Sequence, residues 1–149
     1  MTIKKVCDEK NIIKVLKMFA NTLRSLSQGD GFIKAMGKKI YDFGNLIVLC
    51  DEKNIYGFAG YYANDIILKK AYISMIAIYP QYRGCGYGRD LLNAISNYAS
   101  LEGMEIIRLQ VDKCNAGAIK FYQKCMFRIV EECDDSYYME YCIERKQEI

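Results

Sequence analysis

Residues 79–92 decide the fold, and their sequence is YPQYRGCGYGRDLL. The apolar run over residues 73–78, just before them, is typical of a buried strand. Apolar residues then recur at helical spacing, at Leu91, Leu92, Ile95 and Ala99. The stretch is therefore expected to contain the end of a strand, a glycine-rich turn and the beginning of a helix.

The turn has glycine at every second position, Gly84, Gly86 and Gly88. Backbone N–H groups beside glycine are not shielded by side chains, and a helix N-terminus adds unpaired donors and a partial positive charge. This combination predicts a site for an anion such as a pyrophosphate. A helix entry that merely contains glycine would show the same local pattern, so the turn alone leaves both interpretations open.

The spacing of the glycines excludes the two commonest nucleotide loops. A P-loop needs Gly-x-x-x-x-Gly-Lys-Ser/Thr, a string that the chain lacks, so an ATP site would have neither its lysine nor its magnesium-binding hydroxyl. A dinucleotide fingerprint needs Gly-x-Gly-x-x-Gly in the first strand-helix unit, whereas this turn comes halfway along the chain.

The whole sequence of 149 residues suits one domain, 1–149, with a single proline and no linker or repeat. It has no apolar run of membrane-spanning length and no signal-peptide pattern, which predicts a cytoplasmic protein with no membrane partner. The net charge is only +3 and the basic residues are scattered, so no nucleic-acid partner is expected. A homodimer stays possible.

Cysteine and histidine usage limits the chemistry. The seven cysteines are an odd number with no Cys-x-x-Cys spacing, and the chain has no histidine. This excludes histidine-based triads and zinc-finger patterns, and it predicts no metal cofactor. Without a histidine to lower a thiol pKa, most of the cysteines are expected to be small apolar fillers rather than nucleophiles or disulfide partners.

Periodicity and turn residues predict the other elements. Four helices are predicted: one that begins at Asn11, one over residues 32–43, one from the glycine turn to about residue 102, and one over residues 114–124. The predicted apolar face of the second helix consists of Phe32, Met36, Ile40 and Phe43. The predicted strands are 2–6, 46–50, 55–62, 71–78, 105–111, 127–132 and 137–143, and the fifth could lie parallel to the fourth.

A second motif, NAGAIKFYQK, occupies residues 115–124. On a helix, Ala118 and Tyr122 lie on one face, with Asn115 one turn earlier beside them. An ordinary amphipathic helix capped near Asn115 would have the same pattern.

Together the two motifs resemble those of the GNAT acetyltransferase superfamily. Arg83-x-x-Gly86-x-Gly88 after a strand resembles its acetyl-CoA pyrophosphate loop, and residues 115–124 resemble the helix after its fifth strand. The strand order over residues 46–143 also agrees. The resemblance implies an α/β (α+β) fold, with a central mostly antiparallel mixed sheet, splayed strands four and five, and flanking helices.

The resemblance also implies the site. Acetyl-CoA, as cosubstrate, would lie between strands four and five, with its pantetheine arm paired to the backbone of Ile76, Ala77 and Ile78. Its pyrophosphate would bind the loop formed by Arg83, Gly84, Cys85, Gly86, Tyr87, Gly88 and Arg89. Asn115 and Ala118 would line the pantetheine, and the Tyr122 hydroxyl would protonate the departing thiolate as general acid. Because a tyrosine has an ordinary pKa of about 10, we expect activity to fall at alkaline pH as Tyr122 loses its proton.

The implied activity is transfer of an acetyl group to a primary amine. The acceptor could be a small metabolite, an amino sugar or a protein N-terminus. A different class of function, a non-catalytic acyl-CoA-binding or regulatory module of the same fold, is the alternative. The carboxylates of Glu131, Glu132, Asp134 and Asp135 would either attract a cationic acceptor or form a solvated hairpin tip.

The chain departs from the family pattern at three places. Cys125-Met126-Phe127 replaces the usual Leu-Gly-Phe, so the turn after the second motif is expected to differ. Cys85 occupies a variable loop position, where it could be merely tolerated or form a mixed disulfide. The fourth strand has no glutamate to act as general base, which leaves Asp65, Asp112, Tyr61 and Tyr72 as candidates by their place at strand ends.

Overall fold

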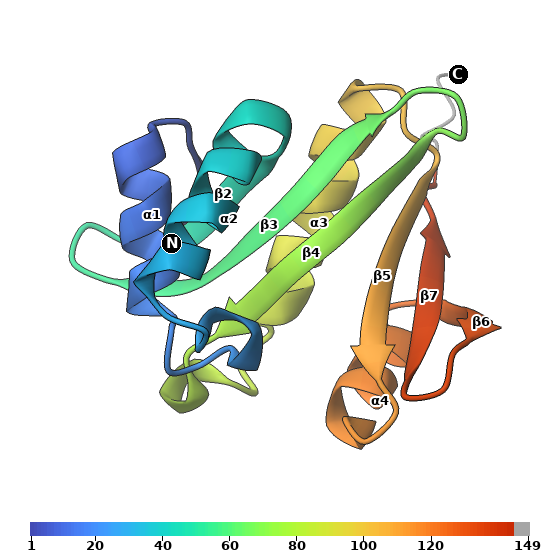
Figure 1. Cartoon of the computed structure of the whole chain (residues 1–149). Helices are drawn as coiled ribbons and strands as arrows, with labels where there is room; N and C mark the ends of the chain where they lie inside the picture. Colours follow the sequence, from blue (N-terminus) through green and yellow to red (C-terminus); the bar gives the residue numbers. More distant parts are fainter. Residues whose placement is uncertain (145–149) are drawn as a thin grey trace.

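The computed structural model describes residues 1–144 as a seven-stranded sheet with four α-helices (Figure 1). In chain order the elements are β1 (Thr2–Val6), α1 (Glu9–Met18), α2 (Asp30–Phe43), β2 (Asn45–Cys50), β3 (Ile55–Asp65), β4 (Lys70–Ile78), α3 (Tyr87–Leu101), β5 (Ile106–Asp112), α4 (Ala116–Lys124), β6 (Arg128–Glu132) and β7 (Ser136–Cys142). Short 3₁₀ helices occupy Arg24–Leu26, which the sequence did not predict, and Pro80–Tyr82.

The strand order is β1-β2-β3-β4-β5-β7-β6. Every neighbouring pair is antiparallel except β4 and β5, which are parallel. This confirms the predicted mixed and mostly antiparallel sheet. A parallel pair needs a crossover, and α3 provides it.

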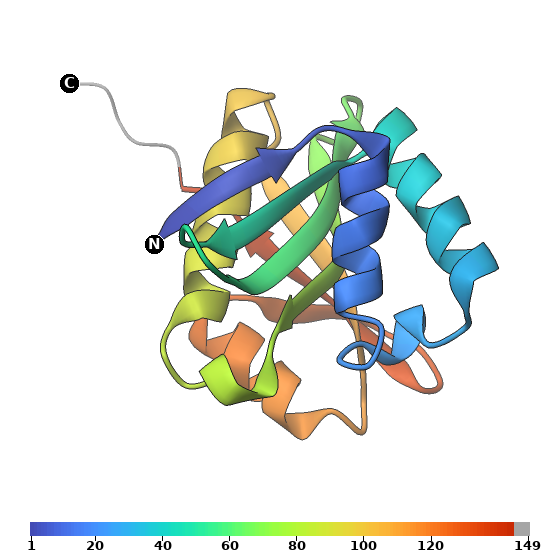
Figure 2. The ribbon, with the colours of Figure 1, turned by 90° about the vertical axis from the view of Figure 1, so that its left-hand side faces the viewer.

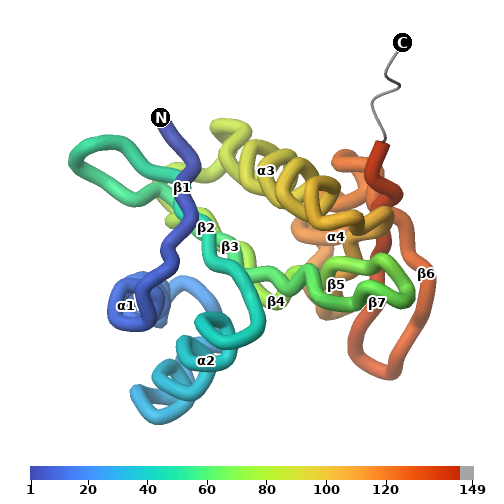
Figure 3. The backbone as a smooth tube through the Cα atoms, turned by 90° about the horizontal axis from the view of Figure 1, so that it is seen from above, coloured from blue at the N-terminus to red at the C-terminus, as the bar shows by residue number. Residues whose placement is uncertain are grey.

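Helices cover both faces of the sheet. Figure 3 shows α1 and α2 on one side and α3 and α4 on the other, and Figure 2 shows β1 at the outer edge beside β2. Each side has its own apolar core. One contains Leu91, Leu92 and Ile95 of α3, and the other contains Ile12, Val15 and Leu16 of α1.

A β-bulge in β4 changes which face its side chains reach. Gly60 of β3 is opposite Met75 and Tyr61 is opposite Ile73, so Ser74 is an extra residue, and its hydroxyl donates to the Gly60 carbonyl at 3.2 Å. Ile73 packs in the core with α3, whereas Met75 packs in the core with α1 and α2. One inserted residue therefore divides the alternate apolar residues of β4 between the two cores, with Ala71 and Ile73 on one side and Met75 and Ala77 on the other.

The buried face of α2 is rotated from the predicted one. Its fully buried residues are Ile33, Gly37 and Ile40, while Phe43 is exposed. A Cβ on Gly37 would lie 2.5 Å from a side-chain carbon of Ile13 in α1, so the missing side chain lets the two helices approach closely. Ile40 is buried and Phe32 and Met36 pack against this core, so the prediction is correct for these three and wrong for Phe43. It missed Ile33 and Gly37 because it weighed large apolar residues and ignored the glycine.

Helix length and composition also bear on membranes. Among residues 1–144, no helix is both long enough and apolar enough to cross one.

Candidate active site

β4 and β5 form a fork. They pair only from Lys70 to Ile73 on β4 and from Ile106 to Leu109 on β5, although β4 continues to Ile78. Figure 1 shows the two strands together at one end and far apart at their arrowheads. The predicted separation of strands four and five is thus present, and the second half of β4 has a strand neighbour on one side only.

The backbone orientation along this half of β4 follows from the antiparallel ladder. The Tyr79 N–H donates to the Tyr56 carbonyl of the preceding strand at 3.1 Å. Because such a ladder alternates, Ala77 also turns its N–H and C=O toward β3, whereas Ile76 and Ile78 turn theirs toward the fork. Of the three residues predicted to pair with pantetheine, Ile76 and Ile78 are therefore the better placed.

The glycine loop offers a run of unpaired donors. In the part of the chain that the structure describes, none of the six amides from Gly84 to Arg89 donates to a protein carbonyl; the first paired amide is Asp90 N–H, to the Gly86 carbonyl at 3.1 Å. Gly84 (φ 81°) and Gly86 (φ 84°) have left-handed backbone conformations. These conformations expose consecutive N–H groups beside the N-terminus of α3, an arrangement suited to an anion.

Gly88 has a packing role besides the one predicted. It lies in the first turn of α3, and a Cβ there would meet the Phe121 ring of α4 at 2.9 Å. The third glycine therefore lets α3 and α4 pack, in addition to leaving its own N–H uncovered. A substitution at Gly88 would disturb this packing, so Gly86 is the cleaner position at which to test the loop.

The side chains of Arg83, Cys85 and Arg89 in the loop make separate contacts. The Arg83 Nε donates to the Ile78 carbonyl at 3.2 Å and so ties the loop to the end of β4. The exposed Cys85 Sγ lies 3.9 Å from the Arg83 carbonyl. Arg89 is close to α4, where its charge opposes the rise that burial causes in the pKa of Cys125.

Asn115 and Ala118 lie at the start of α4. Asn115 is the N-cap, and its Oδ1 accepts the Ala118 N–H at 3.1 Å. The capping interpretation of this asparagine is thus correct. Its side-chain NH₂ has no partner among the described residues and stays available to a ligand.

Tyr122 lies one turn after Ala118 and is buried. Its ring packs against Phe121 and Phe127, with centroid distances of 5.3 and 5.6 Å. Burial raises the pKa of Tyr122 to about 12, with a smaller contribution from Cys125. The hydroxyl therefore stays protonated at neutral pH, as a proton donor must.

The turn after α4 is built as in a glycine-capped helix, contrary to the prediction. Met126 takes the left-handed conformation itself (φ 72°). The Phe127 N–H donates to the Tyr122 carbonyl at 2.9 Å and the Met126 N–H donates to the Gln123 carbonyl at 3.1 Å, the two bonds of a Schellman motif. This cap orders the turn that leads from Tyr122 to Phe127.

The four candidate bases differ in their surroundings. Tyr61 is buried, its hydroxyl has no hydrogen-bond partner among residues 1–144, and burial raises its pKa, so it stays protonated and is a poor base. Asp65 accepts the Leu68 N–H at 3.0 Å at the hairpin end of β4, far along the strand from the loop. Tyr72, opposite Arg108 in the register, and Asp112, at the end of β5, adjoin the fork. Burial raises the pKa of Tyr72 despite the opposing charge of Arg108.

Two of the four acidic residues predicted at the hairpin, Glu131 and Glu132, form ion pairs. Glu131 pairs with Arg108 at 2.6 Å, and Glu132 pairs with Lys113 at 2.7 Å. Both belong to β6 rather than to the turn. These pairs favour the interpretation of a solvated, internally neutralised hairpin over an acceptor site.

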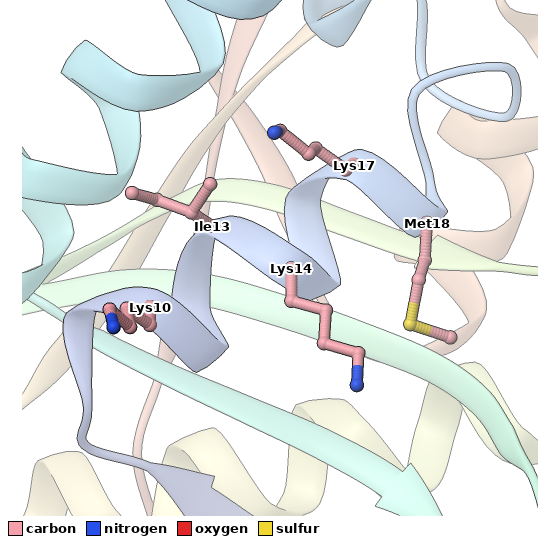
Figure 4. Close-up of a pocket in the computed structure, with 5 residues that line it drawn as sticks. All are labelled: Lys10, Ile13, Lys14, Lys17 and Met18. Carbon is pink, nitrogen blue, oxygen red and sulfur yellow. The ribbon is translucent and has the colours of Figure 1, made fainter.

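A shallow cavity of about 480 Å³ lies elsewhere, over the outer face of α1 (Figure 4). It is lined by Lys10, Ile13, Lys14, Lys17 and Met18. Three lysines without an acid or nucleophile offer no catalytic arrangement, and neither motif contributes to the cavity. The fork and its loop therefore remain the candidate site.

Sequence comparison places the chain among acetyltransferases. The model of the acetyltransferase (GNAT) family matches residues 19–127. N-alpha-acetyltransferase 50 of Danio rerio is 29% identical over an alignment of 133 positions, and the match covers 80% of this chain and 70% of that protein. The ribosomal protein bS18-alanine N-acetyltransferase of Haemophilus influenzae is 31% identical over 83 residues, and this match spans only 54% of that enzyme and 56% of this chain.

Solved structures agree on the fold. A GNAT-family protein of Desulfovibrio desulfuricans superposes with a TM-score of 0.81 at 13% identity, over 96% of this chain and 99% of that one. The PaiA N-acetyltransferase of Thermoplasma acidophilum, solved in complex with coenzyme A, has a TM-score of 0.71 at 16% identity, over 95% of this chain and 99% of that one. With its forked sheet, its glycine loop and a family model that matches most of its length, the chain belongs to the acetyltransferase (GNAT) family.

Proposed function

We propose that residues 1–149 form one catalytic domain that transfers the acetyl group of acetyl-CoA to the α-amino group of a peptide or protein. The observation that carries the proposal is the run of six amides at Gly84–Arg89, which have no protein partner among residues 1–144. The run lies a few residues after β4, whose last residues turn backbone groups toward the fork. The amides suit a pyrophosphate, and the Ile76 and Ile78 backbone suits an amide-bearing arm that adds to the strand. The six amides from Gly84 to Arg89 and the backbone of Ile76 and Ile78 would hold the cofactor.

Acetyl-CoA supplies an acyl group activated as a thioester. When the acceptor nitrogen bonds to the carbonyl carbon, the carbon–sulfur bond breaks and the sulfur leaves with the electron pair. The Tyr122 hydroxyl is proposed to give this sulfur its proton, and solvent restores the proton to Tyr122. Well-placed acid catalysis contributes about 10²- to 10⁴-fold in rate.

The shortage of strong bases favours an α-amine as acceptor. The chain has no histidine, and β4 carries no acidic residue. An α-amino group has a pKa of about 8, so roughly a quarter is neutral at pH 7.5, whereas only about one lysine side chain in a thousand is neutral there. An α-amine can thus attack with little help, and the remaining proton passes to water or to Asp112, because the raised pKa of Tyr72 keeps its hydroxyl protonated and unable to accept it.

The names of the relatives point the same way. The Danio rerio and Haemophilus influenzae relatives are named as acetyltransferases of an N-alpha group and of a ribosomal-protein alanine. Cytoplasmic placement belongs to the same proposal, and seven cysteines in a reducing compartment fit it.

A thiol-release assay with matched peptides tests the proposal. One peptide has a free N-terminus and no lysine, and the second has an acetylated N-terminus and one internal lysine. We expect acetyl-CoA-dependent thiol release with the first peptide only. Equal rates with both peptides would overturn the choice of acceptor, and coenzyme A binding without thiol release from acetyl-CoA in the presence of any amine would indicate the non-catalytic module instead.

A further inference from the structure

Tyr56, in β3, contacts both ends of the glycine loop. Its ring lies 4.6 Å from the Tyr82 ring and 5.6 Å from the Tyr87 ring, centroid to centroid. Tyr82 ends the 3₁₀ helix before the loop and Tyr87 is the first residue of α3 after it. The four residues between these two tyrosines, 83–86, include both left-handed glycines.

Tyr56 is itself held in place from two sides. Its hydroxyl donates to Asp51 Oδ2, and the Asp51 Oδ1 accepts the Lys53 and Asn54 N–H groups at 2.8 and 2.7 Å. Its carbonyl accepts the Tyr79 N–H at 3.1 Å. The ring is therefore fixed to the β2–β3 turn and to the end of β4, both of which belong to the sheet.

The loop has little of its own to hold its shape. Across the described residues, its amides from Gly84 to Arg89 make no hydrogen bond to the protein, and two of its three glycines, Gly84 and Gly86, have the left-handed conformations that come with high backbone freedom. Ordering such a loop upon binding opposes affinity, so a contact that orders it beforehand strengthens binding.

We propose that Tyr56 is a positioning residue that holds the two ends of the glycine loop at the spacing in which its amides bind the diphosphate of the cofactor. This inference rests on the proposed function, because it takes the loop as the diphosphate site. Tyr56 touches neither the thioester nor the acceptor in this arrangement. Its effect is therefore confined to the half of the cofactor that carries phosphate.

The test compares two acetyl donors, acetyl-CoA and acetyl-pantetheine, which lacks the diphosphate and the nucleotide. For Tyr56→Ala we expect KM for acetyl-CoA to rise about tenfold with kcat nearly unchanged, and kcat/KM for acetyl-pantetheine to stay at the wild-type value. Tyr56→Phe keeps both ring contacts and loses only the bond to Asp51, so a rise of about two- to threefold is expected.

Two further variants separate positioning from general damage. Tyr82→Ala removes one of the two ring contacts on the loop side, and it should reproduce the selective loss for acetyl-CoA even if Tyr56→Ala folds poorly. Tyr98→Ala is the matched control, since Tyr98 is a half-buried tyrosine in α3 whose ring contacts Lys5 rather than the loop. It should change neither donor's kcat/KM.

The outcomes are distinct. If the wild type uses acetyl-pantetheine as well as acetyl-CoA, the assignment of the loop to the diphosphate fails and the role of Tyr56 fails with it, whereas acetyl transfer to the α-amine stands. If the wild type transfers acetyl from neither donor, the proposed function itself fails. A third outcome is that the wild type prefers acetyl-CoA while Tyr56→Ala and Tyr82→Ala lower kcat/KM equally for both donors, or for neither. In that case the positioning role of Tyr56 is wrong while the loop assignment stands.

Discussion

At the scale of single residues, the environment of Tyr122 changes the pH dependence that its residue type alone would predict. Packing against Phe121 and Phe127 buries the side chain, and burial raises its pKa from about 10 to about 12. A general acid acts while protonated, so its activity falls only as the pH rises through this higher value. The predicted alkaline loss of activity near pH 10 should therefore be absent, with kcat flat to that point.

Tyr122→Phe removes the hydroxyl and keeps the ring. We expect kcat to fall by roughly ten- to a thousandfold and KM for acetyl-CoA to change little, because the proton is needed only as the thiolate leaves. Steady-state kinetics from pH 6 to 10 provide the measurement. Tyr141→Phe, on the β7 side of Phe127, is the control and should keep the wild-type kcat. Wild-type kcat in Tyr122→Phe would reduce Tyr122 to a packing residue.

Local spacing predicted some of these residues and missed others. Gly84, Gly86 and Tyr122 belong to short motifs, where a few neighbouring positions determine both conformation and exposure. Tyr56 shows no such signal, since an aromatic residue in an apolar strand is ordinarily core, and its partners Tyr82 and Tyr87 are about thirty residues away. Contacts made across the fold could not be found from spacing.

At the scale of elements, the cap of α4 shows that hydrogen bonds and not residue type define a turn. Met126 has the left-handed conformation that glycine usually supplies, and it is exposed. The sequence predicted a different turn because a methionine disfavours this conformation by about 1 to 2 kcal/mol. The packing of Tyr122 and Phe127 on either side maintains it nonetheless.

Met126→Gly should relieve this strain. Glycine is also freer in the unfolded chain, which offsets part of the gain, so we expect a net increase of about 0.5 to 1 kcal/mol in the free energy of unfolding. For a domain of this size Tm should rise by about 1 to 4 °C in a calorimetric scan. Gln123→Gly, inside α4 and in ordinary helical conformation, is the matched control and should lower Tm. A lower Tm for Met126→Gly would show that the methionine side chain stabilises the turn by contacts.

The β4 bulge is the other element that the sequence did not predict. A regular alternation over residues 70–78 would direct Ala71, Ile73, Met75 and Ala77 to one face, whereas the extra residue Ser74 divides them between the two cores. The pattern of apolar residues in β4 is the same with or without the bulge. The bulge is determined by the facing strand and by the two helix layers, which the sequence of β4 alone does not reveal.

At the scale of the whole molecule, the sheet consists of two halves joined at one end of the fork. Strands β1–β4 and strands β5–β7 share only the short parallel ladder between Lys70–Ile73 and Ile106–Leu109. Side chains reinforce this joint. The Glu140 Oε2 of β7 accepts from Lys70 Nζ of β4 at 2.9 Å and from Arg108 Nη1 of β5 at 2.7 Å, and Arg108 also pairs with Glu131 of β6 at 2.6 Å.

Glu140 therefore links both halves across the strand between them. Burial alone would raise the pKa of Glu140, but the hydrogen bonds from Lys70 and Arg108 outweigh burial and hold it below its usual value. A carboxyl group with a lowered pKa stabilises the fold above its unfolded-state pKa of about 4.3, and this contribution disappears as the pH falls through its lower folded-state pKa. The joint should weaken in acid for this reason.

Glu140→Gln should remove this contribution while keeping the size of the side chain. At pH 7 we expect a loss of about 1 to 3 kcal/mol in the free energy of unfolding, since two charged hydrogen bonds to a largely buried carboxylate are lost. Urea unfolding at intervals from pH 3 to 7 is the measurement, and the difference from wild type should shrink as Glu140 becomes protonated in the wild type. Glu132→Gln is the control, because its pair with Lys113 is exposed and surface pairs contribute little. A difference that stayed constant down to pH 3 would mean that the glutamine disturbs packing at the joint, and that the charge of Glu140 does not hold the two halves of the sheet together.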